Sequence, residues 1–206
     1  IQASTDQTAN LFELRAPDGT LSGIYIDSKG HLVGAAHGGA EFFAGREAGE
    51  YAVNATSSVL IGQNAGKSSE NLSRGVAIGY QAGQRASGVE DSIFIGSSAG
   101  NRVYGKERLG VALSDHELIA IGNSALLGAS GTKRVVAIGP FEAGLYANDC
   151  EASTFIGHQA GSTTSGVTNS NAIGLHAAHG AKDCSDTNMM GTQAGYLSKS
   201  NTKSSF

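Results

Sequence analysis

The chain has 206 residues, with 30 Gly, two Pro and no Trp, and its formal net charge is −4. An apolar fraction of 40% with so small a net charge excludes a disordered chain. The weak acidic balance argues against nucleic acid or an anionic membrane as a partner, and no apolar run is long enough for membrane insertion as a helix. Because each Gly weakens a helix by about 1 kcal/mol, the composition predicts strands and turns throughout.

Residues 1–36 are predicted to form a short N-terminal β-meander, or shaft segment. Apolar runs at residues 11–15, 21–26 and 31–33 are typical of strands, and the segments between them are rich in Pro, Asp and Gly, as turns are. Strands so few and short do not form a stable domain alone. We therefore expect this segment to pair with copies of itself or with the first coil of the domain that follows.

A pattern close to Val-Ala-Ile-Gly-x-x-Ala-Gly recurs through residues 37–206. The steps between its Ile-Gly pairs are 17, 17, 26, 17, 18, 17 and 17 residues, with Met190 replacing Ile in the last copy. The Ile residues are Ile61, Ile78, Ile95, Ile121, Ile138, Ile156 and Ile173. So short and regular a period predicts an all-β solenoid in which each repeat is one coil of a parallel stack. With a degenerate copy at Ala44-Gly45, we expect about nine coils of 17 residues.

The 26-residue step between Ile95 and Ile121 contains nine extra residues, which we place around residues 101–116. Insertions in solenoids loop out from one face, and this is often the binding face. The candidate receptor-contact residues on this loop are Arg102, Tyr104, Lys106 and Arg108. A tolerated spacer without a ligand explains the insertion equally well.

Two neighbouring columns of the repeat are apolar on every coil: the Ile column and the column immediately before it. Side chains alternate faces along a strand, so both faces of the sheet are expected to be buried. A lone chain does not normally expose so long an apolar stripe, which predicts self-association into a parallel, cyclic oligomer. The residues assigned to core and oligomer packing are Leu60, Ile61, Ile78, Phe94, Ile95, Ile121, Ile138, Phe155, Ile156 and Ile173.

Two further columns are predicted to form polar contacts between coils. Two residues before the Ile column, Val and Ile give way to Thr154, Asn171 and Asn188 towards the C-terminus, and stacked Asn side chains can form ladders. Three residues before the Ile column, Ser recurs where the turn meets the strand, and we expect it to hydrogen-bond there. The column holds Ser58, Gly75, Ser92, Ser153, Ser170 and Thr187.

No catalytic or metal-binding pattern stands out, so we expect neither an enzyme nor a cofactor. Glycoside cleavage needs two carboxylates in a groove, and the candidate pairs lie in turns, where charge is ordinarily solvated. These pairs are Glu90-Asp91, Asp115-Glu117 and Asp149-Glu151. His158 and His176 could hold an ion only on an oligomer axis. Cys150 and Cys184 are two coils apart, about 9–10 Å, which is too far for a disulfide.

Segments such as Val76-Ala77-Ile78-Gly79-Tyr80-Gln81-Ala82-Gly83 resemble the head repeats of trimeric autotransporter adhesins and the Ala-Ile-Gly-x-x-Ala-Gly repeats of bacteriophage tail fibres. The adhesin likeness implies a homotrimeric parallel β-roll. The opening segment, from Gln7 through Leu32, resembles one found in phage tail-fibre shafts, which favours the phage family.

The phage resemblance implies a structural, host-recognition component of a virion. Its expected partners are copies of itself, other virion tail proteins and a glycan or protein of the host cell surface. Two alternatives remain open: the head domain of a trimeric adhesin on a bacterial surface, and a glycan-degrading tailspike. New reducing ends released from host polysaccharide would distinguish the tailspike.

Overall fold

The computed structural model describes most of the repeat region and two short pieces before it. The described residues are 25–26, 32–33, 42–105, 107–108, 111–112, 117–132, 134–144, 147, 152–161, 163–166, 168–178, 180–183, 185, 188–192 and 194. Within these ranges every regular element is a β-strand. None of these residues belongs to a helix with the length and hydrophobicity that a membrane span requires.

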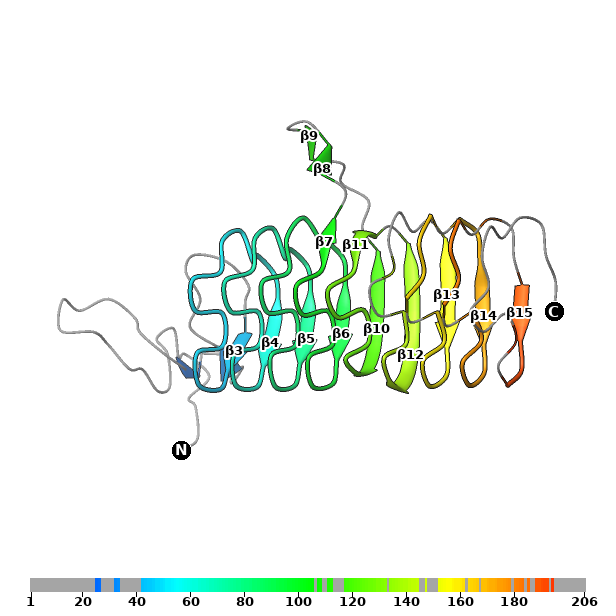
Figure 1. Cartoon of the computed structure of the whole chain (residues 1–206). Helices are drawn as coiled ribbons and strands as arrows, with labels where there is room; N and C mark the ends of the chain where they lie inside the picture. Colours follow the sequence, from blue (N-terminus) through cyan, green and yellow to red (C-terminus); the bar gives the residue numbers. More distant parts are fainter. Residues whose placement is uncertain are drawn as a thin grey trace, which may run out of the picture.

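The main element is a nine-stranded sheet in which each strand pairs in parallel with the strand of the next coil (Figure 1). Its strands follow chain order: β3 (Phe42–Ala44), β4 (Val59–Ile61), β5 (Val76–Ile78), β6 (Ile93–Ile95), β10 (Leu118–Asn123), β12 (Val135–Phe141), β13 (Ser153–Ile156), β14 (Asn171–Ile173) and β15 (Asn188–Met190). The pairing aligns Ile with Ile, as in Ile61 opposite Ile78. The predicted parallel β-solenoid is therefore confirmed, with about seven turns.

A second, narrower parallel ladder joins the coils from Val53 to Thr132. Single bridges join Val53 to Glu70, Glu70 to Ser87 and Ser87 to Tyr104. The ladder continues where β7 (Tyr104–Gly105) pairs in parallel with β11 (Ser130–Thr132). Along this part of the stack, each coil thus supplies one strand of three or more residues to the main sheet and one short bridge or strand to the second ladder, with turns between them.

The column immediately before Ile faces the interior of the coil and is completely buried. Each of its two Phe rings lies between two small side chains: Phe94 between Ala77 and Ala120, and Phe155 between Ala137 and Ala172. The small neighbours leave room above and below each ring, as close packing requires. On the other walls of the interior lie further fully buried side chains, among them Leu72, Val89, Val103 and Leu126.

The Ala-Gly half of the motif forms the corner that packs on this core. Gly66 and Gly83 both have a φ of +61°, in the left-handed region. A Cβ on Gly66 would lie 2.6 Å from Cδ1 of Leu60. The corner therefore needs Gly both for its backbone and for its closeness to large core residues. Ala178 takes the same place with φ 58°, on a coil whose inward residue is the small Ala172.

The 18-residue step is accommodated by a bulge. β10 and β12 pair in register up to Ile121 opposite Ile138, and then Asn123 pairs with Phe141. One extra residue, from the Gly139-Pro140 segment, is thus absorbed without disturbing the next coil, where Ile138 again faces Ile156.

Two antiparallel pairs lie outside the coils. β1 (Tyr25–Ile26) pairs with β2 (Leu32–Val33), within two of the strands predicted for the N-terminal meander; the predicted strand at 11–15 lies outside the described residues. β8 (Glu107–Arg108) pairs with β9 (Val111–Ala112), and this hairpin stands off the stack (Figure 1).

Residues 101–105, at the start of the segment in which the sequence places the insertion, follow the path of the coil. Asn101 and Val103 are buried, and Tyr104 belongs to the second ladder, so residues 101–105 are part of the coil.

Candidate functional site

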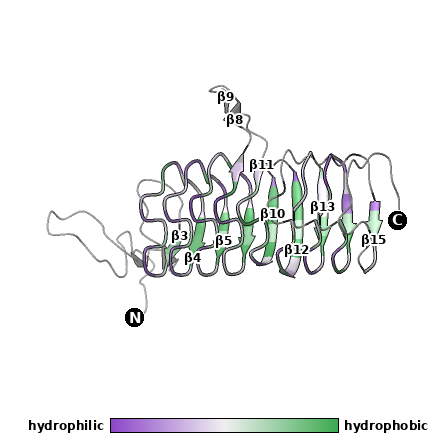
Figure 2. Ribbon diagram, in the orientation of Figure 1, coloured by the Kyte–Doolittle hydropathy of each residue, from purple (hydrophilic) through white to green (hydrophobic). Residues whose placement is uncertain are grey.

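The outer face of the nine-stranded sheet is apolar over most of its height. The Ile column points outwards, and Ile61, Ile95, Ile138 and Ile156 each keep 36% of their surface exposed. A second outward column stands two residues earlier and is half-buried; it contains Val59, Val76, Ile93, Ile119 and Val136. Figure 2 shows these strands as a hydrophobic band running along the stack. We call these two columns the outer apolar face.

The residues assigned to core and oligomer packing divide between the two sides of the sheet. Leu60, Phe94 and Phe155 lie inside the coil with no exposed surface. The Ile residues of the set, from Ile61 to Ile173, lie on the outer apolar face. Only the side chains of the first group are completely buried by the chain itself.

The outer face becomes polar on the last three coils, where Thr154, Asn171 and Asn188 occupy the second column. The Asn171 side-chain amide donates to Oδ1 of Asn188 at 3.0 Å, so the predicted Asn ladder is confirmed at this step. The ladder links two coils across an exposed surface, where water competes for the same groups.

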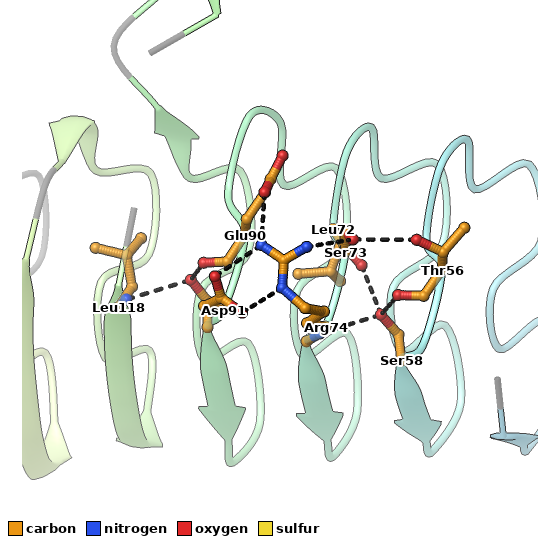
Figure 3. A network of polar contacts seen from close by, with 10 residues as sticks. Thr56, Ser58, Leu72, Ser73, Arg74, Glu90, Asp91 and Leu118 are labelled. Carbon is orange, nitrogen blue, oxygen red and sulfur yellow. Dashed lines mark hydrogen bonds and ion pairs between the residues drawn. The ribbon is translucent and has the colours of Figure 1, made fainter. Parts of the chain in front are cut away.

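The predicted hydrogen bonds of the Ser column are confirmed on three coils. Ser58 is fully buried; its hydroxyl donates to the carbonyl of Leu72 at 2.6 Å and accepts from the N–H of Gly75 at 3.1 Å (Figure 3). Ser92 accepts from the N–H of Leu118 at 3.2 Å, and Ser170 donates to the carbonyl of Ser185 at 2.6 Å. These serine hydroxyls supply hydrogen-bond partners to backbone N–H and carbonyl groups where the turn joins the strand.

The edge of the outer apolar face carries a shallow depression of about 350 Å³. Its floor is made by Ile93, Ile119 and Val136, and its rim by Asp91, Glu117 and Arg134. The rim residues precede the floor residues by two positions on three successive coils. Apolar floor and charged rim are the usual anatomy of a contact surface.

The carboxylate pair Glu90-Asp91 is held by an arginine. Arg74 donates to both carboxylate oxygens of Asp91, at 2.6 and 2.8 Å, and to Glu90 at 2.8 Å (Figure 3). The hydrogen bonds from Arg74 lower the pKa of Asp91. An acid held in its ionised form is a poor proton donor for glycoside cleavage. Of the other predicted pairs, Asp115, Asp149 and Glu151 lie outside the described residues.

Lys67 is paired in the same way on an earlier coil. Its ammonium lies 2.6 Å from Glu47 and 2.7 Å from Glu50. The hydrogen bonds from these carboxylates raise the pKa of Lys67, and that of Glu47 is lowered by its bond with Lys67. These pairs tie neighbouring coils together at the surface.

The structure separates the four candidate receptor-contact residues. Arg102 and Tyr104 are exposed and lie on the coil itself, not on a protruding loop. Arg108 belongs to β8 of the projecting hairpin, with its side chain outside what the structure describes, and Lys106 lies outside the described residues.

The two candidate histidines lie side by side on neighbouring coils. The rings of His158 and His176 have centroids 6.0 Å apart, and Phe141 lies 5.7 Å from His158 on the other side. Across the part of the chain that the structure describes, no group of three or more His, Cys, Asp or Glu side chains could hold a metal ion. Cys150 and Cys184 fall outside that part.

Comparisons of the chain with protein-family models, curated proteins and solved structures found no match.

Sequence reasoning missed one exposed residue beside the candidate contact residues. Arg85 takes the same position on the preceding coil as Arg102 takes on its own. The backbone N–H of Arg102 donates to the carbonyl of Gln84, the residue before Arg85. The signal was present in the sequence, because the two arginines are separated by one 17-residue period.

Proposed function

We propose that this chain is a segment of a homotrimeric phage tail fibre that attaches to the host cell surface, with about nine coils in each subunit. The outer apolar face carries this proposal. This face belongs to a sheet of nine strands, which extends about 38 Å along the stacking axis at roughly 4.8 Å between neighbouring strands. A continuous apolar surface of this kind marks an interaction site.

A second and third copy of the chain are the occupants that best fit this face. Its apolar columns run along the stacking axis, so parallel copies bring Val and Ile against Val and Ile on the early coils. They bring the polar coils of Thr154 and Asn171 against their equivalents at the other end. An antiparallel copy would bury these polar side chains against Val and Ile, at the cost of desolvation.

The mechanism is mechanical and multivalent. The coils are joined by an unbroken sheet, by the Ser column and by ion pairs between coils, which make a stiff rod. A rigid trimer presents three copies of each surface site in one geometry. Weak contacts with a cell surface then reinforce one another through effective concentration.

The first test is the mass in solution, measured by light scattering during size exclusion. The expected mass is three times the 20.9 kDa of one chain. A well-behaved monomer in dilute buffer would overturn the trimer.

The second test is binding of the fluorescent protein to intact cells, measured by flow cytometry with bacterial and animal cells side by side. Binding to bacteria without release of new reducing ends supports the tail-fibre proposal. Binding to animal cells alone would favour the adhesin head, and release of reducing ends from bacterial polysaccharide would favour the tailspike.

A further inference from the structure

Arg85 and Arg102 stand one above the other on adjacent coils. Both are exposed turn residues with left-handed backbones, at φ 55° and 56°. The backbone N–H of Arg85 donates to the carbonyl of Lys67 at 2.9 Å, and that of Arg102 to the carbonyl of Gln84 at 2.8 Å. Because the coils are about 4.8 Å apart, the two side chains start from fixed and neighbouring points.

The two arginines differ from the paired cations of the preceding coil. Lys67 and Arg74 each contact two carboxylates. No carboxylate in the described residues forms an ion pair with Arg85 or Arg102, although the chain has 18 acidic residues against 14 Lys and Arg. Two like charges one coil apart repel each other, and a bound anion would relieve that repulsion.

Tyr104 adds an aromatic surface beside these charges. It lies two residues after Arg102, with the buried Val103 between them, so both point away from the core. Tyr104 is 47% exposed. Its backbone is held on both sides, by the bridge to Ser87 and by pairing with Ser130. An exposed tyrosine ring on a backbone held in this way offers an apolar face to a sugar ring, and a hydroxyl at its edge.

We propose that Arg85, Arg102 and Tyr104 form a binding site for an acidic polysaccharide. The guanidinium forks bind a carboxylate or phosphate oxyanion through paired N–H donors, and the Tyr104 ring packs on the sugar that bears it. The proposal rests on the proposed function, since it names the ligand class of the host-attachment surface. Three copies in one trimer would turn weak sites into firm attachment.

The test uses the full chain and a double variant, Arg85→Gln with Arg102→Gln. The matched control is Arg46→Gln with Lys182→Gln, which removes two charges from exposed positions elsewhere. The immobilised probes are polygalacturonate, which bears carboxylates, dextran phosphate, which bears phosphates, and neutral dextran. Circular dichroism verifies that each variant is folded.

We expect the wild type and the control to bind at least one acidic probe, more weakly at high salt, and to ignore dextran. The Arg85/Arg102 variant should bind roughly tenfold more weakly or worse, as loss of charge-assisted hydrogen bonds implies. Tyr104→Phe should retain binding and Tyr104→Ala should reduce it. The preferred acidic probe identifies carboxylate or phosphate as the recognised group.

Three results would overturn the site: equal binding by both double variants, equal binding to dextran, or no binding of the wild type to either acidic probe. The proposed function is judged separately, by mass and by binding to intact bacteria. A trimer that binds bacteria equally well with and without Arg85 and Arg102 would retire this site and leave the tail fibre in place. A chain that binds no cells would retire the attachment function itself.

Discussion

Gly62 and Gly79 approach each other so closely that neither coil leaves room for a side chain between them. A Cβ on Gly62 would lie 2.5 Å from the carbonyl oxygen of Gly79. Gly62 also has φ +126°, a backbone conformation that L residues rarely adopt. The same approach recurs from Gly79 to Gly96 at 2.5 Å. The Gly after each Ile is therefore what allows successive coils to stack at the spacing of a β-sheet.

Replacing Gly62 by Ala should destabilise the solenoid strongly. The backbone conformation alone costs about 1–3 kcal/mol for a residue with a side chain, and here the backbone of the next coil must also move. The matched control is Gly191→Ala, where φ is +101° but no atom lies within 4 Å of the added Cβ. Urea unfolding should show a clearly larger loss of unfolding free energy for Gly62→Ala. Equal losses would mean that the cost of Gly62→Ala comes from its backbone conformation and not from its close approach to Gly79.

The stacking of coils could be predicted from the sequence, but the direction of each column could not. The period fixes which residues pair, so Ile61 opposite Ile78 follows from a 17-residue step. Leu60 and Ile61 are both apolar, and hydrophobicity does not say which one faces inwards. The structure shows how they differ: the buried column mixes Phe, Leu and Met with Ala because the interior has a fixed width, whereas the outer column repeats Ile.

The candidate site was predicted only in part, for a related reason. The segment Asn101-Arg102-Val103-Tyr104 repeats Gln84-Arg85-Ala86-Ser87 one period later, so it belongs to the coil. Its side chains differ enough from those of the previous coil to hide the match. The ion pairs of Lys67 and Arg74 also depend on side-chain reach across coils, which a sequence pattern does not give.

Substituting Asp for both Ile95 and Ile121 should dissociate the proposed trimer while leaving the solenoid folded. These residues are adjacent on the outer apolar face and point away from the core. Light scattering should show a shift from trimer to monomer, with the circular dichroism of the wild type. The control, Ser87→Asp, adds a charge on the second ladder and should stay trimeric. A trimer that survives the double substitution would place the interface elsewhere.

Phe94→Ala tests the opposite side of the same strand. Phe94 has no exposed surface, so truncation leaves a cavity in the coil and should cost about 3–5 kcal/mol of unfolding free energy. The measurement is urea unfolding at several protein concentrations, which separates loss of the fold from loss of assembly. A cost below about 1 kcal/mol would contradict the assignment of this column to the core.

The insertion should be removable without loss of the solenoid. Replacing residues 106–115 by a single Leu restores the 17-residue step and keeps Val103 and Tyr104 in the coil. Leu is chosen because Leu72 and Val89 occupy the equivalent position on earlier coils and are fully buried. The midpoint of thermal unfolding should be at least as high as that of the wild type, because the loop to be closed is shorter.

Deleting 102–110 instead serves as the contrasting variant. It also restores the step, but it removes the buried Val103 and the ladder residue Tyr104. This deletion should lower the midpoint of thermal unfolding. If the two variants behave alike, residues 101–105 do not hold their coil together.

The ion pairs between coils predict two different pH profiles of stability. Arg74 lowers the pKa of Asp91, so its contribution is present above the unfolded pKa of about 3.9 and is lost as the pH falls through the lower folded value. The difference in unfolding midpoint between the wild type and Arg74→Met should therefore vanish only in acid. Arg itself does not deprotonate at accessible pH, so the alkaline side stays flat.

The unfolding midpoint of Lys67→Met should differ from that of the wild type over a narrower range of pH, because this pair loses its charge at both ends. The lowered pKa of Glu47 gives the same loss in acid. The raised pKa of Lys67 adds a contribution that is complete below the unfolded pKa of about 10.4 and is lost as the pH rises through the folded value. Thermal unfolding of both variants and the wild type from pH 3 to 11, at low and high salt, measures this difference. An alkaline loss for Arg74→Met, or none for Lys67→Met, would contradict the pairing, since only the lysine can lose its charge there.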